Sequence, residues 1–158
     1  MESKVGHEAL KPNPGLKALK VVVGNWDTVG THPFFPGKTF HGKTTFKWIE
    51  GGAFVLMRSE IDEPEIPSGI AIFGSDDSAP DHYMLYFDER DVSRKYDWSI
   101  ERNVLRWRRN SPEFSQRMEL TISDDGKTMV GRGEMRRNGG AWEPDLELTY
   151  SRSEASGR

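Results

Sequence analysis

Aromatic and sulfur-containing side chains recur at every second position in several stretches of this sequence, interspersed with a few polar groups. Flat or adaptable apolar side chains with a small number of hydrogen-bonding groups are typical of small-molecule pockets. We therefore expect an apolar or aromatic small molecule as the partner. The residues predicted to line its pocket are Trp48, Met57, Ser59, Tyr96, Trp98, Trp107, Gln116, Met118, Met135 and Tyr150.

Core packing is the alternative interpretation of these side chains, and for any one of them it is the simpler. As a set they favour a cavity, because the inward indoles of Trp48, Trp98 and Trp107 exceed what a packed barrel requires. A buried indole N–H also needs an acceptor. Gln116, Tyr150 or a water molecule could provide one.

The motifs of common enzyme classes are absent from the sequence. It contains no G-x-S-x-G elbow, no phosphate-binding P-loop, no G-x-G-x-x-G and no H-x-x-x-H pair. It also lacks cysteine, which excludes thiolate nucleophiles and cysteine metal sites. We therefore predict no catalytic residue. Two alternatives remain: acid–base chemistry on a carbonyl-containing ligand by a buried carboxylic acid, His82 or a tyrosine, and a filled structural barrel.

One acidic cluster with a histidine could in principle hold a hard cation through its oxygen atoms. It consists of Asp76, Asp77, Asp81 and His82. The intervening Ser78, Ala79 and Pro80 are ordinary turn residues, and the spacing is not that of a calcium loop. We predict a solvated turn and no metal.

The overall charge gives little attraction for nucleic acid or anionic lipid. The net charge is −3 and the pI about 5.8, with 30% of residues charged. No apolar run approaches the ~20 residues of a membrane span, and the N-terminal stretch 1–12 is charged where a signal peptide would be apolar. We expect a cytoplasmic protein that binds neither nucleic acid nor a membrane.

The elements that must position the pocket residues are one helix and a long series of strands. Leu16, Leu19 and Val23 follow Pro14 at helical spacing, which predicts a short helix over 16–23 that ends at Gly24. From Trp26 the apolar period changes to two. Strands are predicted at 26–30, 41–50, 53–61, 69–74, 82–88, 94–100, 104–109, 114–123, 128–137 and 142–152.

Sequential strands in this number close most simply into a barrel without exposed edges. The predicted fold is all-β, a single antiparallel up-and-down barrel of about ten strands, with the short N-terminal helix lying across one end. The barrel domain spans 14–152, between flexible tails at 1–13 and 153–158. A loop with two adjacent aromatics, Phe34 and Phe35, should lie near an opening of the barrel.

Two strands, 69–74 and 82–88, are apolar on both faces, so the pattern does not say which face is inside. Another element or a second subunit could cover their outer face, and a homodimer is therefore possible. Charged residues on the outer face of the later strands suggest either a basic patch or cross-strand ion pairs. We favour ion pairs, because carboxylates alternate with the arginines. The residues are Arg117, Glu119, Arg132, Glu134, Arg136 and Glu147.

The helix leading into Gly24-Asn25-Trp26 resembles the G-x-W start of calycin barrels, which include lipocalins, fatty-acid-binding proteins and nitrobindins. Residues 50–54, 69–74, 81–89 and 140–150 are similar to a bacterial lipocalin-like family described only as a domain of unknown function. The resemblance covers about residues 16–152 in order. It implies a ten-stranded barrel without established chemistry.

The resemblance also implies a structural role for Trp26 and Arg152. In lipocalin-like barrels an arginine near the end of the last strand packs over the G-x-W tryptophan. The alternative is a carboxylate anchor of Arg152 with Tyr150, as in fatty-acid-binding proteins, but those have an Arg-x-Tyr order and this chain has Tyr150-Ser151-Arg152. Nitrobindins bind haem through a C-terminal histidine. The four histidines here are His7, His32, His41 and His82, so no cofactor is expected.

Overall fold

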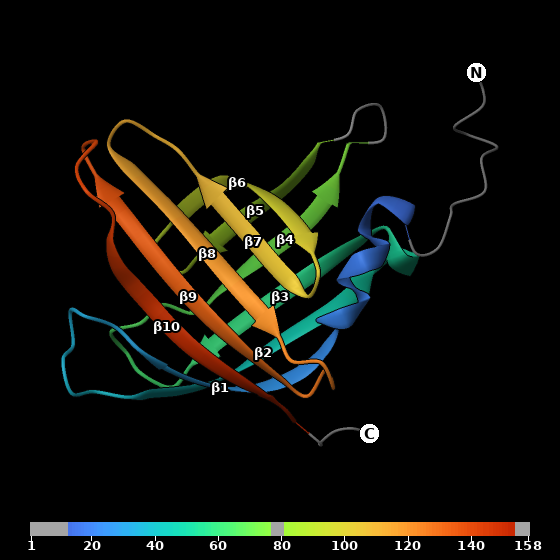
Figure 1. Ribbon diagram of the computed structural model, residues 1–158, viewed down its shortest axis with the longest axis horizontal. Coiled ribbons are helices and arrows are strands. Elements are labelled where there is room, and N and C mark those ends of the chain that lie inside the picture. The colour runs from blue at the N-terminus through green and yellow to red at the C-terminus, as the bar shows by residue number, and fades with distance from the viewer. Residues whose placement is uncertain (1–12, 77–80, 154–158) are drawn as a thin grey trace.

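The computed structural model of the protein describes residues 13–76 and 81–153, and these form a closed antiparallel barrel of ten strands (Figure 1). Each strand pairs with its neighbours in the sequence, and β1 pairs with β10 to close the sheet. The predicted all-β up-and-down barrel is confirmed. The predicted tails lie outside the described residues, apart from Asn13 and Ser153. The strands are β1 (Gly24–Thr31), β2 (Phe40–Ile49), β3 (Phe54–Ile61), β4 (Gly69–Ser75), β5 (His82–Asp88), β6 (Val92–Glu101), β7 (Val104–Arg109), β8 (Phe114–Ile122), β9 (Thr128–Arg137) and β10 (Glu143–Arg152).

The predicted N-terminal helix is a 3-10 helix, η1 (Pro14–Val21), instead of an α-helix over 16–23. Asn13 caps it by accepting the Gly15 N–H at 2.8 Å. Three consecutive β-branched valines follow Lys20, and such residues disfavour continuation of an α-helix. A second 3-10 turn, η2 (Glu50–Gly52), joins β2 to β3. No helix within 13–76 and 81–153 is long and apolar enough to cross a membrane.

The two ends of the barrel differ. η1 lies at the end where β1 begins, and the loop 32–39 lies at the end where β1 finishes and β2 begins (Figure 1). We call these the helix end and the loop end. Leu16 and Leu19 of η1 are fully buried, and η1 contacts β3 and β4. The helix end is therefore packed by apolar side chains.

Arg152 and Trp26 are in contact at the helix end. The guanidinium carbon lies 4.1 Å from the Trp26 ring centroid. Arg152 also donates to three backbone carbonyls, those of Val23 at 2.6 Å, Gly126 at 2.9 Å and Val21 at 3.0 Å. The contact therefore ties the end of β10 to the chain segment between η1 and β1.

The structure settles the faces of β4 and β5, which the sequence pattern left open. Ala71 and Phe73 of β4 and Met84 of β5 are buried in the core. Their neighbours Ile72 and Leu85 pair across the outer face and remain half-buried. The continuous apolar runs of these strands thus divide between core and outer surface.

A bulge interrupts the alternation of β10. Pro144 pairs with Glu134 and Glu147 pairs with Arg132, so Asp145 and Leu146 together stand opposite the single residue Gly133. An extra residue of this kind redirects side chains. Strict alternation from Tyr150 and Leu148 predicts Asp145 on the outer face, but at the bulge the Asp145 side chain reaches Gln116 on the inner face.

Replacing Leu19 with Asp should lower the free energy of unfolding by about 3 kcal/mol or more, because an unpaired carboxylate would be buried among apolar side chains. Urea unfolding measures the change. The matched control is Ala18→Asp, which places the same charge at an exposed position of η1. Equal stability of the two variants would show that η1 does not pack on the barrel in solution.

Replacing Arg152 with Met should lower the free energy of unfolding by about 2 kcal/mol, through loss of the cation–π contact and of three hydrogen bonds to partly buried carbonyls. Arg58→Met, on the exposed face of β3, is the control. Ligand affinity of the folded protein should not change. Lost affinity with unchanged stability would instead identify Arg152 as a carboxylate anchor.

Candidate functional site

The predicted pocket residues divide into two groups by burial. Met57, Tyr96, Trp98, Met135 and Tyr150 are buried. Trp48, Ser59, Trp107, Gln116 and Met118 are half-buried. Whether any of them contacts a ligand stays a prediction, but the structure shows which of them lie together.

Trp98 is engaged in packing near the helix end. Its indole N–H donates to the carbonyls of Tyr83 at 2.9 Å and Gly74 at 3.2 Å. His82 stacks on the ring with centroids 4.4 Å apart, and Phe73 meets it edge-on at 5.8 Å. The expected N–H acceptors, Gln116, Tyr150 or water, are therefore wrong for Trp98, because carbonyls of adjacent strands lie within reach.

Trp107 and Met118 form the middle of the barrel wall. Trp98 pairs with Trp107, and Trp107 pairs with Met118, so the three share one level of the inner face. Trp107 also meets Phe73 edge-on at 5.9 Å. Both Trp107 and Met118 are half-buried. The apolar packing is thus less complete here than around Trp98.

A polar network crosses the barrel near the loop end. The Tyr96 hydroxyl donates to Gln116 Oε1 at 2.5 Å, and Gln116 Nε2 donates to Asp145 Oδ2 at 2.9 Å. The other carboxylate oxygen of Asp145 lies 2.8 Å from His32 Nε2. The network therefore links alternate strands β6, β8 and β10 to the loop 32–39.

The backbone fixes the tautomer of His32. The Phe34 N–H points to His32 Nδ1 at 3.0 Å, so Nδ1 acts as the acceptor. Nε2 then carries the proton and donates it to Asp145 Oδ1. Both oxygens of Asp145 are thus occupied by donors from neutral groups.

The loop 32–39 folds onto the loop end through its aromatic rings. Phe35 packs edge-on against Phe40 at 5.7 Å, and the Arg137 guanidinium lies 5.5 Å from the Phe34 ring. A cavity of about 420 Å³ lies between the loop and the bulge of β10, with His32 and Asp145 in its wall. Phe35 also lines this cavity, and whether Phe34 and Phe35 lie at an opening into the barrel stays a prediction.

Two arginines also belong to the inner face at this end. Arg109 pairs with Gln116, and Arg94 pairs with Tyr86. The Nε of Arg109 is buried and has no hydrogen-bond partner among the described residues. Burial raises the pKa of Tyr96, while the guanidiniums of Arg94 and Arg109 act in the opposite direction. The Tyr96 phenol is therefore a proton donor near neutral pH and not a base.

A second polar group at this end is self-contained. Tyr86 donates to Asp88 Oδ2 at 2.7 Å, and Arg90 binds both oxygens of the same carboxylate at 2.7 and 3.1 Å. Burial alone would raise the pKa of Asp88, but the hydrogen bonds from Arg90 and Tyr86 outweigh it and lower this pKa to about 2. Asp88 is thus a fixed, fully paired charge.

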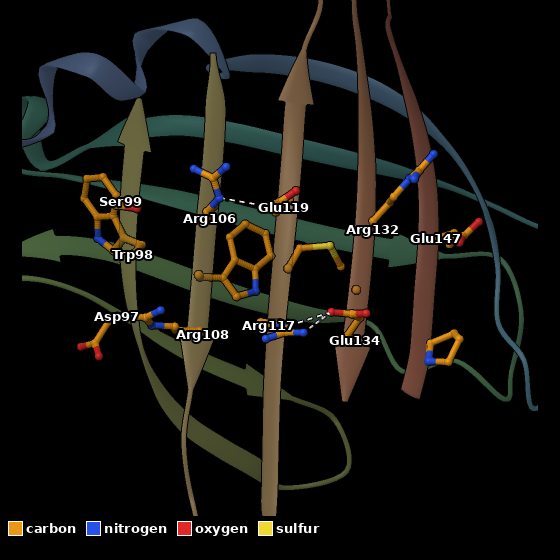
Figure 2. Close-up of a pocket in the computed structure, with 14 residues that line it drawn as sticks. Asp97, Trp98, Ser99, Arg106, Arg108, Arg117, Glu119, Arg132, Glu134 and Glu147 are labelled. Carbon is orange, nitrogen blue, oxygen red and sulfur yellow. Dashed lines mark hydrogen bonds and ion pairs between the residues drawn. The ribbon is translucent and has the colours of Figure 1, made fainter. Parts of the chain in front are cut away.

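A cavity of about 750 Å³, which we call the outer groove, runs along β6–β10 and is lined mostly by charged residues of the outer face, with Trp98, Trp107 and Met118 also among its lining residues. Figure 2 shows its charged walls, in which Arg106 pairs with Glu119 at 2.8 Å and Arg117 pairs with Glu134 at 2.6 Å. Trp142 packs beside Arg117, with 3.8 Å between guanidinium and ring centroid. The prediction of cross-strand ion pairs is confirmed for Arg117, Glu119 and Glu134, and it stays a prediction for Arg132, Arg136 and Glu147.

Sequence reasoning missed four residues of the network region, and two of them carried a signal. Inward-facing residues alternate along each strand. On β6 the positions of Trp98 and Tyr96 are preceded, two residues earlier, by Arg94, and on β7 those of Leu105 and Trp107 are followed, two residues later, by Arg109. Asp145 depends on the bulge of β10, and His32 lies in a loop without periodicity. The pattern could not place these last two.

The acid–base groups considered from the sequence are not brought together. His82 pairs with Ser75 at the helix end, whereas Asp145 and Tyr96 lie near the loop end. Asp77, of the predicted acidic turn, lies outside the described residues.

No protein-family model matches the sequence, and no curated protein matches it. Two solved structures are similar in fold. Rv2717c from M. tuberculosis superimposes with a TM-score of 0.65 at 15% identity, covering 89% of this chain and 98% of that chain. The S-type phycobiliprotein lyase CPES from Guillardia theta superimposes with a TM-score of 0.57 at 8% identity, covering 89% of this chain and 93% of that chain. At these identities the similarity shows a shared barrel fold and nothing finer.

Replacing Asp88 with Asn should lower stability at pH 7 by about 2 kcal/mol. Because its pKa falls from 3.8 unfolded to about 2 folded, this contribution is present above pH 3.8 and is lost as the pH falls through 2. Urea unfolding at pH 7 and pH 2 measures it, with exposed Asp124→Asn as control. An equal deficit for Asp88→Asn at both pH values would contradict the assignment.

Proposed function

We propose that the protein is a binding module that holds a small, mostly apolar molecule inside the barrel, entered from the loop end. The ligand would contact the half-buried Trp107 and Met118 in the middle of the barrel. Its polar atoms would meet the network around Tyr96 and Gln116. We also infer that η1 closes the helix end as a plug, which leaves a single entrance.

The polar network inside the barrel is the observation that carries this proposal. Burying polar groups costs free energy even when most of their hydrogen bonds are made, and leaving one unpaired costs about 1–3 kcal/mol more. A filled structural barrel would avoid that cost with apolar side chains. This barrel has Tyr96, Gln116, Asp145 and Arg109 at the loop end, and the Arg109 Nε is unpaired within the described chain.

The distribution of side chains indicates an amphipathic ligand. Phe73, Trp98 and Trp107 form an apolar floor, and hydrogen-bonding groups stand between that floor and the loop end. Such a combination of apolar wall and few polar groups is typical of ligand sites. The barrel similarity to a phycobiliprotein lyase supports a binding role at the level of fold alone.

An enzyme using the same interior is the less favoured alternative. Tyr96 holds its proton, and both oxygens of Asp145 accept hydrogen bonds from His32 and Gln116. Neither group is free to remove a proton from a ligand without breaking the network.

The neutral dye Nile red tests the proposal. Its fluorescence should rise on binding at micromolar concentration, and the neutral alcohol dodecanol should displace it. Met118→Trp should weaken dye binding at least about tenfold, because the larger ring fills the middle of the barrel.

Glu119→Trp is the matched control, since it adds the same indole to the adjacent, exposed outer position. Its dye affinity should equal that of the unmodified protein. Thermal unfolding of both variants checks the fold. A protein that binds neither probe at about 100 µM, or equal weakening by the two tryptophans, would contradict interior binding.

A further inference from the structure

We propose that Arg94 and Arg109 recognise a carboxylate on the ligand, so that the barrel selects amphipathic acids over neutral molecules of the same length. This inference rests on the proposed binding function and adds the chemical class of the ligand. It places the acid group beside Tyr96 and the apolar chain toward Trp107.

The register brings the two arginines to adjacent levels of one wall. Arg109 lies on β7 between Tyr96 and Gln116, which hydrogen-bond to each other from β6 and β8. Arg94 lies two residues before Tyr96 on β6, and its guanidinium stands 4.9 Å from the Phe114 ring centroid. Arg109 therefore lies beside Tyr96 on the neighbouring strand, and Arg94 lies two residues along the same strand, on the same inner face.

The acidic side chains nearby form no salt bridge with these arginines. Asp88 pairs with Arg90 at 2.7 Å, and Asp145 accepts hydrogen bonds from neutral His32 and Gln116 at 2.8 and 2.9 Å. Asp145 therefore keeps its negative charge, and it opposes two guanidiniums. In the described part of the chain, this wall carries more positive than negative charge, and neither arginine has a carboxylate in contact.

Such an arrangement is costly without a ligand. A partly buried guanidinium loses hydration, which costs free energy when its N–H groups are unpaired. The Arg109 Nε is buried without a hydrogen-bond partner in the described residues. A carboxylate would accept two parallel hydrogen bonds from one guanidinium.

The outer groove has arginines too, but its chemistry differs. Arg106 and Arg117 are exposed and already paired with Glu119 and Glu134 (Figure 2). An added anion would have to displace those carboxylates in high dielectric, where a single pair is worth little. The interior pair is the better anion site.

The experiment compares dodecanoate with dodecanol, which have the same chain and differ in the head group. Each displaces Nile red at pH 8, where the carboxylic acid is ionised. The unmodified protein should bind dodecanoate about tenfold or more tightly than dodecanol, as charge-assisted hydrogen bonds predict. Equal affinities would overturn carboxylate recognition while leaving the binding function intact. Failure of both compounds and of the dye would overturn the binding function itself.

Arg109→Met and Arg94→Met should each remove most of the preference for dodecanoate and leave dodecanol affinity within about twofold. Arg109→Lys should restore part of it, because the charge remains and the planar fork is lost. Arg132→Met, on the exposed face of β9, is the control and should keep the full preference.

Thermal unfolding shows whether each variant folds. If Arg109→Met does not fold, the Arg94→Met and Arg109→Lys variants still test carboxylate recognition. Folded variants that retain the preference would assign the acid to another site. Loss of preference in Arg132→Met would assign it to the outer groove. Either result overturns the proposal.

Discussion

Pairing of β1 with β10 is the constraint on which the rest of the structure depends. It closes the sheet, so every strand must send alternate side chains into one finite interior. Trp26 and Arg152 lie opposite each other in that pairing, and Arg152 holds three carbonyls around the helix end. Closure at this seam therefore also positions η1 against the barrel.

A closed interior has to be filled, and here the two ends are filled differently. Rings of Phe46, Phe73 and Trp98 pack together toward the helix end, with the Trp98 N–H satisfied by backbone carbonyls. Toward the loop end the interior carries hydrogen-bonded polar groups, among them Tyr96 and Gln116. The first half stabilises the fold, and the second half costs stability and is where specificity can arise.

Much of the barrel was predictable because alternation is a local property. Strand order, inner faces and the contact of Trp26 with Arg152 follow from period two and the G-x-W resemblance. The same alternation places Arg94 and Arg109 on the inner face, but the prediction of an apolar pocket did not include them because they are charged. Asp145 was not predictable, since a bulge shifts the phase of β10 without a sequence signature. The apolar spacing of Leu16 and Leu19 predicted a helix but not its 3-10 form, because it says nothing of the β-branched valines that follow Lys20.

The cost of the polar half has a thermodynamic consequence. A buried arginine nitrogen without a partner lowers the stability of the empty barrel, and a ligand that pairs with it recovers that free energy on binding. Binding and folding are then linked through Arg109, while Arg152, whose three nitrogens each donate a hydrogen bond within the chain, contributes the same stability with or without ligand. Arg152 therefore stabilises the barrel because its hydrogen bonds are made within the chain, whereas Arg109 lowers the stability of the empty barrel because its Nε has no partner in the described residues. The hydrogen-bond partners of each arginine distinguish the structural one from the one proposed to bind a ligand.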